Sequence, residues 1–178
     1  MLKTVDYGRI IMRYAVVIYP ELEDVSKIQE LRRKNDPYFN VIGPHITLVF
    51  PFPEMDKDAV VNHVTELLRD FTPFNIRLKG FTKSFDNWLF LIIEQGNEKI
   101  IELHNRLYSG IFEKHLRTDI PYIPHIGLGL FKKDEEYLVA EREARALNLA
   151  FECSIRSICI IYLNDDLSEI FWTKELPL

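Results

Sequence analysis

The sequence predicts an α+β fold of two pseudo-symmetric lobes, each a small antiparallel sheet backed by helices, with a central cleft. Two observations predict it. Apolar segments with strand periodicity alternate with amphipathic helical segments along the chain. The same order of elements also occurs twice at similar intervals, which is typical of two related halves. No long low-complexity linker divides the 178 residues. We therefore expect residues 13–178 to form one bilobal domain, with residues 1–12 as an N-terminal extension.

The first half contains three expected strands and two expected helices. The strand over residues 14–19 is apolar and ends at a proline. A short amphipathic helix follows over residues 22–34. The strand over residues 44–50 is closed by two prolines, and the helix over residues 56–70 has one apolar face. Apolar and polar side chains alternate over residues 74–80, which predicts a strand with one wet face.

The second half repeats this order. Its expected strand, helix, strand, helix and long strand cover residues 88–94, 97–116, 125–131, 134–147 and 151–162. A final strand is expected over residues 170–174.

Composition excludes several classes of function. Hydrophobic residues make up 47% of the chain and charged residues 28%, which is typical of a globular domain. The net charge of −5 argues against a protein that coats long nucleic acid, although a local basic cleft for a small anion stays open. No segment reaches the 18 apolar residues of a membrane span. Arg13 interrupts the only early apolar run, so we expect no signal peptide.

The two cysteines indicate a reducing compartment. Cys153 and Cys159 fall on one expected strand, which would separate them by roughly 20 Å. A disulfide cannot span that distance. Two free thiols, most simply small core residues, predict a cytoplasmic protein.

The most informative feature is a pair of proline-led histidines, 80 residues apart. The first strand begins Pro44-His45-Ile46-Thr47 and the second Pro124-His125-Ile126-Gly127. Residues two apart in a strand share a face. The faces away from the core are expected to carry His45, Thr47 and Val49 in the first strand and His125, Gly127 and Gly129 in the second, with Ile46, Leu48 and Phe50 facing the core. A twofold relation between the halves would place the two imidazoles across a cleft from each other.

This arrangement suits the cleavage of a phosphodiester by in-line displacement. Such a reaction needs a base on one side of phosphorus and an acid on the other, and imidazole serves either role near neutral pH. The hydroxyl of Thr47 would lie beside His45 and donate to a non-bridging phosphate oxygen. The scheme requires neither a metal nor another cofactor.

These motifs resemble those of the 2H phosphoesterase superfamily, also called 2′-5′ RNA ligase-like. The resemblance covers roughly residues 13–175, and Pro44-His45-Ile46-Thr47-Leu48 matches the first motif fully. It implies a cyclic phosphodiesterase that acts on nucleotides or RNA ends, or the reverse 2′-5′ ligation. It also implies His125 as the base and His45 as the acid. The oligomeric state stays open.

The second motif departs from the family pattern, because Gly127 stands where Thr or Ser is expected. A backbone N–H, a water, Tyr122, Lys132 or Lys133 could replace the missing donor. Gly127 and Gly129 could instead make room for a ligand close to the sheet. A third alternative is a non-catalytic module that binds nucleotides or RNA ends. We favour an active enzyme.

Other candidate residues have simpler explanations. His104 and His115 are expected at the edge of the core. The basic run Arg32-Arg33-Lys34 is expected on the solvated surface, although it could steer an anion if the helix end borders the cleft. Phe81, Phe85 and Trp88 flank an expected turn, where one ring could stack on a base; we favour core packing.

Overall fold

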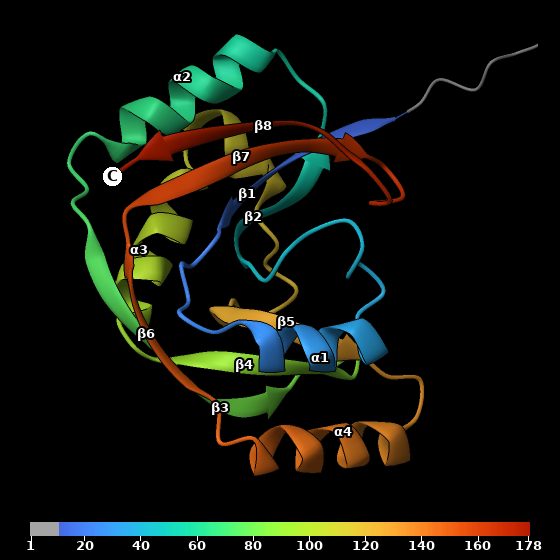
Figure 1. Cartoon of the computed structure of the whole chain (residues 1–178). Coiled ribbons are helices and arrows are strands. Elements are labelled where there is room, and N and C mark those ends of the chain that lie inside the picture. Colours follow the sequence, from blue (N-terminus) through green and yellow to red (C-terminus); the bar gives the residue numbers. More distant parts are fainter. Residues whose placement is uncertain (1–10) are drawn as a thin grey trace, which may run out of the picture.

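Two four-stranded antiparallel sheets form the framework of the computed structural model, which describes residues 11–178 (Figure 1). The first sheet has the strand order β2-β1-β7-β8 and the second has the order β5-β4-β3-β6. The strands are β1 (Met12–Ile18), β2 (Ile46–Pro53), β3 (Phe74–Lys83), β4 (Trp88–Gln95), β5 (His125–Leu130), β6 (Ala150–Ile155), β7 (Ser157–Asn164) and β8 (Ile170–Pro177). The helices are α1 (Ser26–Asn35), α2 (Lys57–Leu68), α3 (Asn97–Leu107) and α4 (Asp134–Ala146).

Helices back both sheets, which confirms the expected fold class. Helix α1 packs against β5 and α4 against β3 and β4, whereas α3 contacts β2 and α2 packs on α3. Each helix buries one apolar stripe in a shared core, as Val60, Val64 and Leu68 do in α2. The N-terminus of α2 is capped by Asp56, whose carboxylate accepts a 2.8 Å hydrogen bond from the Ala59 amide. Over residues 11–178, no helix is long and apolar enough to cross a membrane.

The two halves of the sequence do not correspond to the two lobes. The expected third strands of the repeat, β3 and β6, pair with each other in the second sheet. Strands β1 and β2 are joined instead by β7 and β8 from the end of the chain. Each sheet is therefore built from both halves of the chain, which ties the lobes together. Residues 1–10 of the expected extension lie outside the described residues, and Met12 already belongs to β1.

The long strand expected over residues 151–162 is in fact two strands. The chain leaves the second sheet after Ile155 and enters the first at Ser157, with the exposed Arg156 between them. Cys153 and Cys159 therefore lie in different sheets, and both are free thiols. The residues on either side of the crossing have strand character, so periodicity could not reveal it.

The helix expected over residues 97–116 is also interrupted. Helix α3 ends at Leu107, and a separate 3-10 helix covers Gly110–His115. Gly110 has a φ of +53°, in the left-handed region that an α-helix cannot continue through. The break lets Phe112 enter the core.

Strand β2 is longer and less regular than expected. It includes both prolines that were expected to close it, because β2 is an edge strand where a missing N–H costs no ladder hydrogen bond. Thr47 pairs with Val17 and Val49 with Val16, so a bulge inserts one extra residue in β2. The bulge inverts the alternation, and the expected orientations of Val49 and Phe50 are wrong. Val49 is buried, and Phe50 lines the cavity between the sheets.

Candidate active site

A cavity of about 670 Å³ lies between the two sheets. Its walls include residues from β1, β2, β7 and β8 on one side and from β4 and β5 on the other. His45, Thr47, His125 and Gly127 all line it. The structure therefore brings both histidine motifs to one space, as the duplicated strands predicted.

The two histidines are held in the same way. The Nδ1 of His45 bonds to the Gly43 carbonyl at 2.9 Å, and the Nδ1 of His125 bonds to the Ile123 carbonyl at 2.6 Å. In each case the acceptor is the backbone carbonyl two residues earlier. A carbonyl only accepts, so Nδ1 carries the hydrogen in both rings. The Nε2 nitrogen of each neutral ring is then an unprotonated base that is available to a ligand.

The surroundings favour the neutral form of both rings. Burial lowers the pKa of His45, and the nearby Arg32 adds to this, whereas the Gly43 carbonyl and Asp36 oppose it. Burial lowers the pKa of His125 to about 4; the charge of His45 also lowers it, and the Ile123 carbonyl and Asp86 raise it. The influence of His45 on His125 shows that a charge on one imidazole disfavours a charge on the other.

An aromatic ring lies beside each imidazole. Phe90 stacks on His125 with ring centroids 3.4 Å apart and an interplanar angle of 20°. Tyr19 lies edge-on to His45 at 6.4 Å. His125 is thus fixed by both a hydrogen bond and a stacked ring.

Tyr122 and Lys132, two expected substitutes for the missing hydroxyl, do not line the cavity. The hydroxyl of Tyr122 donates to the Thr47 carbonyl at 2.7 Å, and its ring stacks on the buried His104 at 3.6 Å. Tyr122 therefore supports the backbone of Thr47 instead of facing a ligand. Lys132 is exposed at the end of β5. His104 was expected at the edge of the core but is buried within it, where its Nδ1 bonds to the Leu48 carbonyl.

Other side chains lie close to both glycines of the second motif. A Cβ on Gly129 would lie 2.4 Å from the Cβ of Asn35, so helix α1 fills the space above it. The expectation that Gly129 leaves room for a ligand is therefore wrong. A Cβ on Gly127 would lie 3.3 Å from the Cζ3 of Trp88. Gly127 still lines the cavity, and a side chain at this position would press on the edge of the Trp88 indole.

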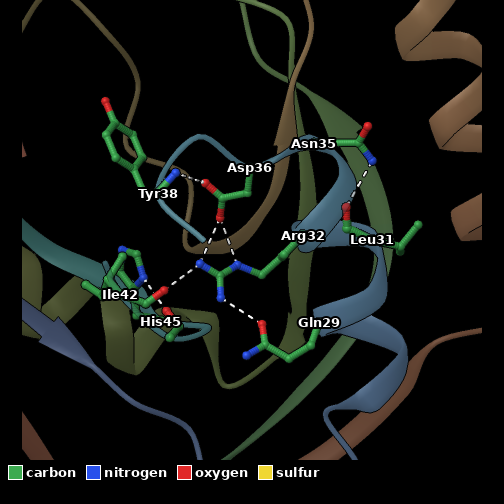
Figure 2. Close-up of polar contacts among 9 residues, drawn as sticks. Gln29, Leu31, Arg32, Asn35, Asp36, Tyr38, Ile42 and His45 are labelled. Carbon is green, nitrogen blue, oxygen red and sulfur yellow. Dashed lines mark hydrogen bonds and ion pairs between the residues drawn. The ribbon is translucent and has the colours of Figure 1, made fainter. Parts of the chain in front are cut away.

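Arg32 is buried, so the prediction from the sequence that it lies on the solvated surface is wrong. We expected it on the solvated surface, but its side chain is 1% exposed. Its guanidinium bonds to Asp36 at 2.8 Å, to Gln29 at 2.9 Å and to the Ile42 carbonyl at 2.7 Å (Figure 2). The available signal was its position four residues after Ile28, on the apolar stripe of α1, with Asp36 four residues further on.

The Arg32 network organises the segment that leads to His45. The second oxygen of Asp36 accepts a 2.8 Å hydrogen bond from the Tyr38 amide (Figure 2). The bond from Arg32 to the Ile42 carbonyl holds the other end of the loop, next to Gly43. The residue before Gly43, whose carbonyl fixes the His45 ring, is therefore held by a buried ion pair.

Comparisons with known proteins agree with this geometry. The model of the 2′-5′ RNA ligase superfamily matches residues 19–167. A Bacillus licheniformis protein named "Putative phosphoesterase" is 29% identical over 133 residues, covering 71% of this chain and 75% of that protein. A Bacillus pumilus protein of the same name is 30% identical over 132 residues, covering 71% and 74%. The crystal structure of Escherichia coli LigT complexed with 3′-AMP has a TM-score of 0.59 and 16% identity, covering 94% and 95% of the two chains, and is similar in fold. The chain belongs to the 2′-5′ RNA ligase superfamily.

Proposed function

We propose that this protein is a phosphodiesterase that hydrolyses a 2′,3′-cyclic or related nucleotide phosphodiester by two-histidine acid/base catalysis. One observation carries the proposal. Two imidazoles from matched strands line one cavity, and each has its Nδ1 bound to a carbonyl and its Nε2 left for a ligand. The family and its relatives named as phosphoesterases support the reaction class.

In this scheme His125 acts as the base and His45 as the acid. The Nε2 of His125 takes a proton from water as the water oxygen forms a bond to phosphorus. The bond between phosphorus and one ribose oxygen breaks, and the imidazolium of His45 gives its proton to that oxygen. Thr47, two residues from His45, donates to a non-bridging oxygen. Proton balance requires one imidazole to be charged and the other neutral when the substrate binds.

The substrate itself supplies the charge that this state needs. Both imidazole pKa values are lowered in the free protein, so both rings are neutral near pH 7. A phosphodiester anion between them raises the pKa of a neighbouring imidazole, because an opposite charge favours the protonated form. Repulsion between the two rings then keeps the second one neutral.

The test is hydrolysis of 2′,3′-cyclic nucleotides by the purified protein. We expect turnover that EDTA leaves intact, and near-complete loss of turnover in both His45→Ala and His125→Ala. Thr47→Val should retain weak activity, because loss of one such donor costs about 2.7–4 kcal/mol. Loss of wild-type turnover on treatment with EDTA would contradict the scheme and indicate a metal-dependent reaction.

Gly127 favours a second candidate, a non-catalytic module that binds a nucleotide or an RNA end. The motif hydroxyl is absent there, and a Cβ at this position would lie 3.3 Å from the Trp88 indole. Gly127→Thr alone would press on the indole, so the informative variant combines Gly127→Thr with Trp88→Leu. If the wild-type protein binds a cyclic nucleotide without turnover and the double variant turns it over, the chain is a binder descended from an enzyme.

A further inference from the structure

Strand β2, which carries Thr47, bonds to side chains from outside its own sheet. It is an edge strand, so another strand pairs with it on one side only. The Tyr122 hydroxyl donates to the Thr47 carbonyl at 2.7 Å, and the Nδ1 of His104 bonds to the Leu48 carbonyl at 2.7 Å. Two buried rings therefore satisfy carbonyls of β2 that no neighbouring strand reaches.

These two rings hold the bulge of β2. They stack on each other, with ring centroids 3.6 Å apart and an interplanar angle of 6°. Successive carbonyls of a regular strand point to opposite sides, so a regular strand would not offer both to one pair of stacked rings. The bulge between Thr47 and Val49 removes this alternation. The direction of Thr47 is therefore tied to the position of the Tyr122 and His104 rings.

Tyr122 also lies in a stiff segment that leads to His125. The run Pro121-Tyr122-Ile123-Pro124 has a proline at each end. Each proline fixes its own φ and restricts the residue before it to an extended conformation. The Ile123 carbonyl bonds to the Nδ1 of His125 at 2.6 Å. One short segment thus joins the hydroxyl that holds Thr47 to the carbonyl that holds His125.

This connection runs between the two sheets. Thr47 lies in β2 and His125 begins β5, and these two edge strands belong to different sheets. Ile123 lines the cavity, whereas Tyr122 packs on the core. Burial raises the pKa of Tyr122, so its hydroxyl stays protonated and remains a donor.

We propose that Tyr122 is a positioning residue that holds the Thr47 hydroxyl at a fixed separation from His125 across the cavity. This role rests on the proposed function for the part that Thr47 and His125 play in the reaction. Tyr122 acts through the backbone of β2 and not through contact with a substrate. Misplacement of a reacting group by about 1 Å can lower a rate about 100-fold, so one hydrogen bond to this backbone can control turnover.

The first test removes the Tyr122 hydroxyl and keeps the ring. In Tyr122→Phe we expect kcat for 2′,3′-cyclic AMP to fall about 10- to 100-fold, while KM changes less than about threefold. The matched control is Tyr108→Phe. Tyr108 is also buried, and its hydroxyl accepts a 2.9 Å hydrogen bond from the Phe50 amide, beyond the bulge of β2. Its kcat should change less than about threefold.

Both variants lose one buried hydrogen bond, so their thermal midpoints should fall by similar amounts. The rates are compared at a temperature at which circular dichroism shows the wild type and both variants to be folded. An equal fall of kcat in Tyr122→Phe and Tyr108→Phe would overturn the positioning role, because it would reflect a general loosening of β2.

A double-mutant cycle with Thr47→Val identifies the residue through which Tyr122 acts. If Tyr122 positions the Thr47 hydroxyl, its own hydroxyl matters little once that group is gone. We expect Tyr122→Phe to lower kcat less than about threefold in the Thr47→Val background. A purely structural role would give the same factor in both backgrounds, and that result would overturn the inference.

NMR spectra test the connection without turnover. The Thr47 carbonyl and the Leu48 amide belong to one peptide group, so loss of the bond from Tyr122 should shift the Leu48 amide signal. We expect Tyr122→Phe to shift this signal and the ring signals of His125, and Tyr108→Phe to leave both in place. A shift at Leu48 alone would overturn the connection to His125.

The two proposals fail separately. Turnover by the wild type with an unchanged kcat in Tyr122→Phe would refute the positioning role and retain the proposed function. A wild type without turnover would refute the proposed function. In that case NMR shifts at both Leu48 and His125 would retain the connection through Tyr122, and their absence would refute it as well.

Discussion

Replacing His125 by Asn should make the stability of the protein less sensitive to acid. The asparagine amide can donate to the Ile123 carbonyl as Nδ1 does, but it does not titrate. The pKa of His125 is lowered to about 4 in the folded protein, against about 6.5 in the unfolded chain. Between these values the unfolded state binds a proton that the folded state does not. The free energy of unfolding therefore falls as the pH falls, and this contribution is fully present only above the unfolded pKa.

The size of the effect follows from the two pKa values. His125 alone should lower the free energy of unfolding of the wild type, relative to pH 7, by about 2 kcal/mol at pH 5 and by about 3 kcal/mol at pH 4. His125→Asn lacks this loss. Relative to the wild type, the variant should therefore gain the same amounts of unfolding free energy at pH 5 and at pH 4. The carboxylates contribute equally to both proteins and cancel in the difference.

Urea denaturation at several pH values between 4 and 7 measures this difference. Thr47→Val is the matched control, since it changes another cavity-lining residue without removing a titrating group. Its difference from the wild type should stay constant with pH. If the curves of His125→Asn and wild type run parallel from pH 7 to pH 4, the surroundings of His125 do not favour its neutral form and the electrostatic description of the site is wrong.

Three further predictions concern the site and its support. Because both imidazole pKa values are lowered, the plot of kcat/KM against pH should be bell-shaped with its maximum below pH 6.5. The maximum of kcat should lie at higher pH, because the bound anion favours the imidazolium. A kcat/KM maximum above pH 7 would contradict this prediction. Asp36→Asn should lower the free energy of unfolding by about 3–5 kcal/mol, because it leaves the buried charge of Arg32 without its partner. The matched control is Glu30→Gln, which removes an exposed ion pair with Lys34 and should cost less than about 1 kcal/mol. Equal thermal midpoints for the two variants would refute the role of the buried pair. Gly129→Ala should lower the free energy of unfolding by about 1–3 kcal/mol, because the added methyl group overpacks against helix α1. In the control Gly43→Ala the added Cβ has nothing within 4 Å, so the free energy of unfolding should change by no more than about 0.5 kcal/mol. Urea denaturation compares the two variants, and equal losses would show that α1 does not close over β5.

The presence of two lobes was predictable from the sequence, but the set of strands that forms each lobe was not. Strand and helix periodicity are local properties. They identified most elements and the repeat, but not the breaks after Ile155 and Leu107. Which strands pair is decided by contacts between distant residues. The pairing of β3 with β6 and the crossing at Arg156 depend on such contacts, because the residues around Arg156 have strand character on both sides.

In the candidate site too, the sequence predicted some features and the tertiary structure decided the others. The two proline-led strands were sufficient to identify His45, Thr47 and His125 and to expect them on one cavity. The bulge beside Thr47, the cover over Gly129 and the indole beside Gly127 all depend on neighbouring elements. Arg32 was misplaced because a basic run is normally solvated, and only the fold shows that Asp36 and the Ile42 carbonyl enclose it.

The sequence by itself therefore determined that two imidazoles and a hydroxyl share one kind of strand face, since residue type and strand alternation decide this. Tertiary structure alone decided their ionisation and their surroundings. Burial lowers the imidazole pKa values, and the space left by Gly127 is shared with a ring from another strand. Both effects arise from the packing of residues far apart in the chain, on which local periodicity carries no information.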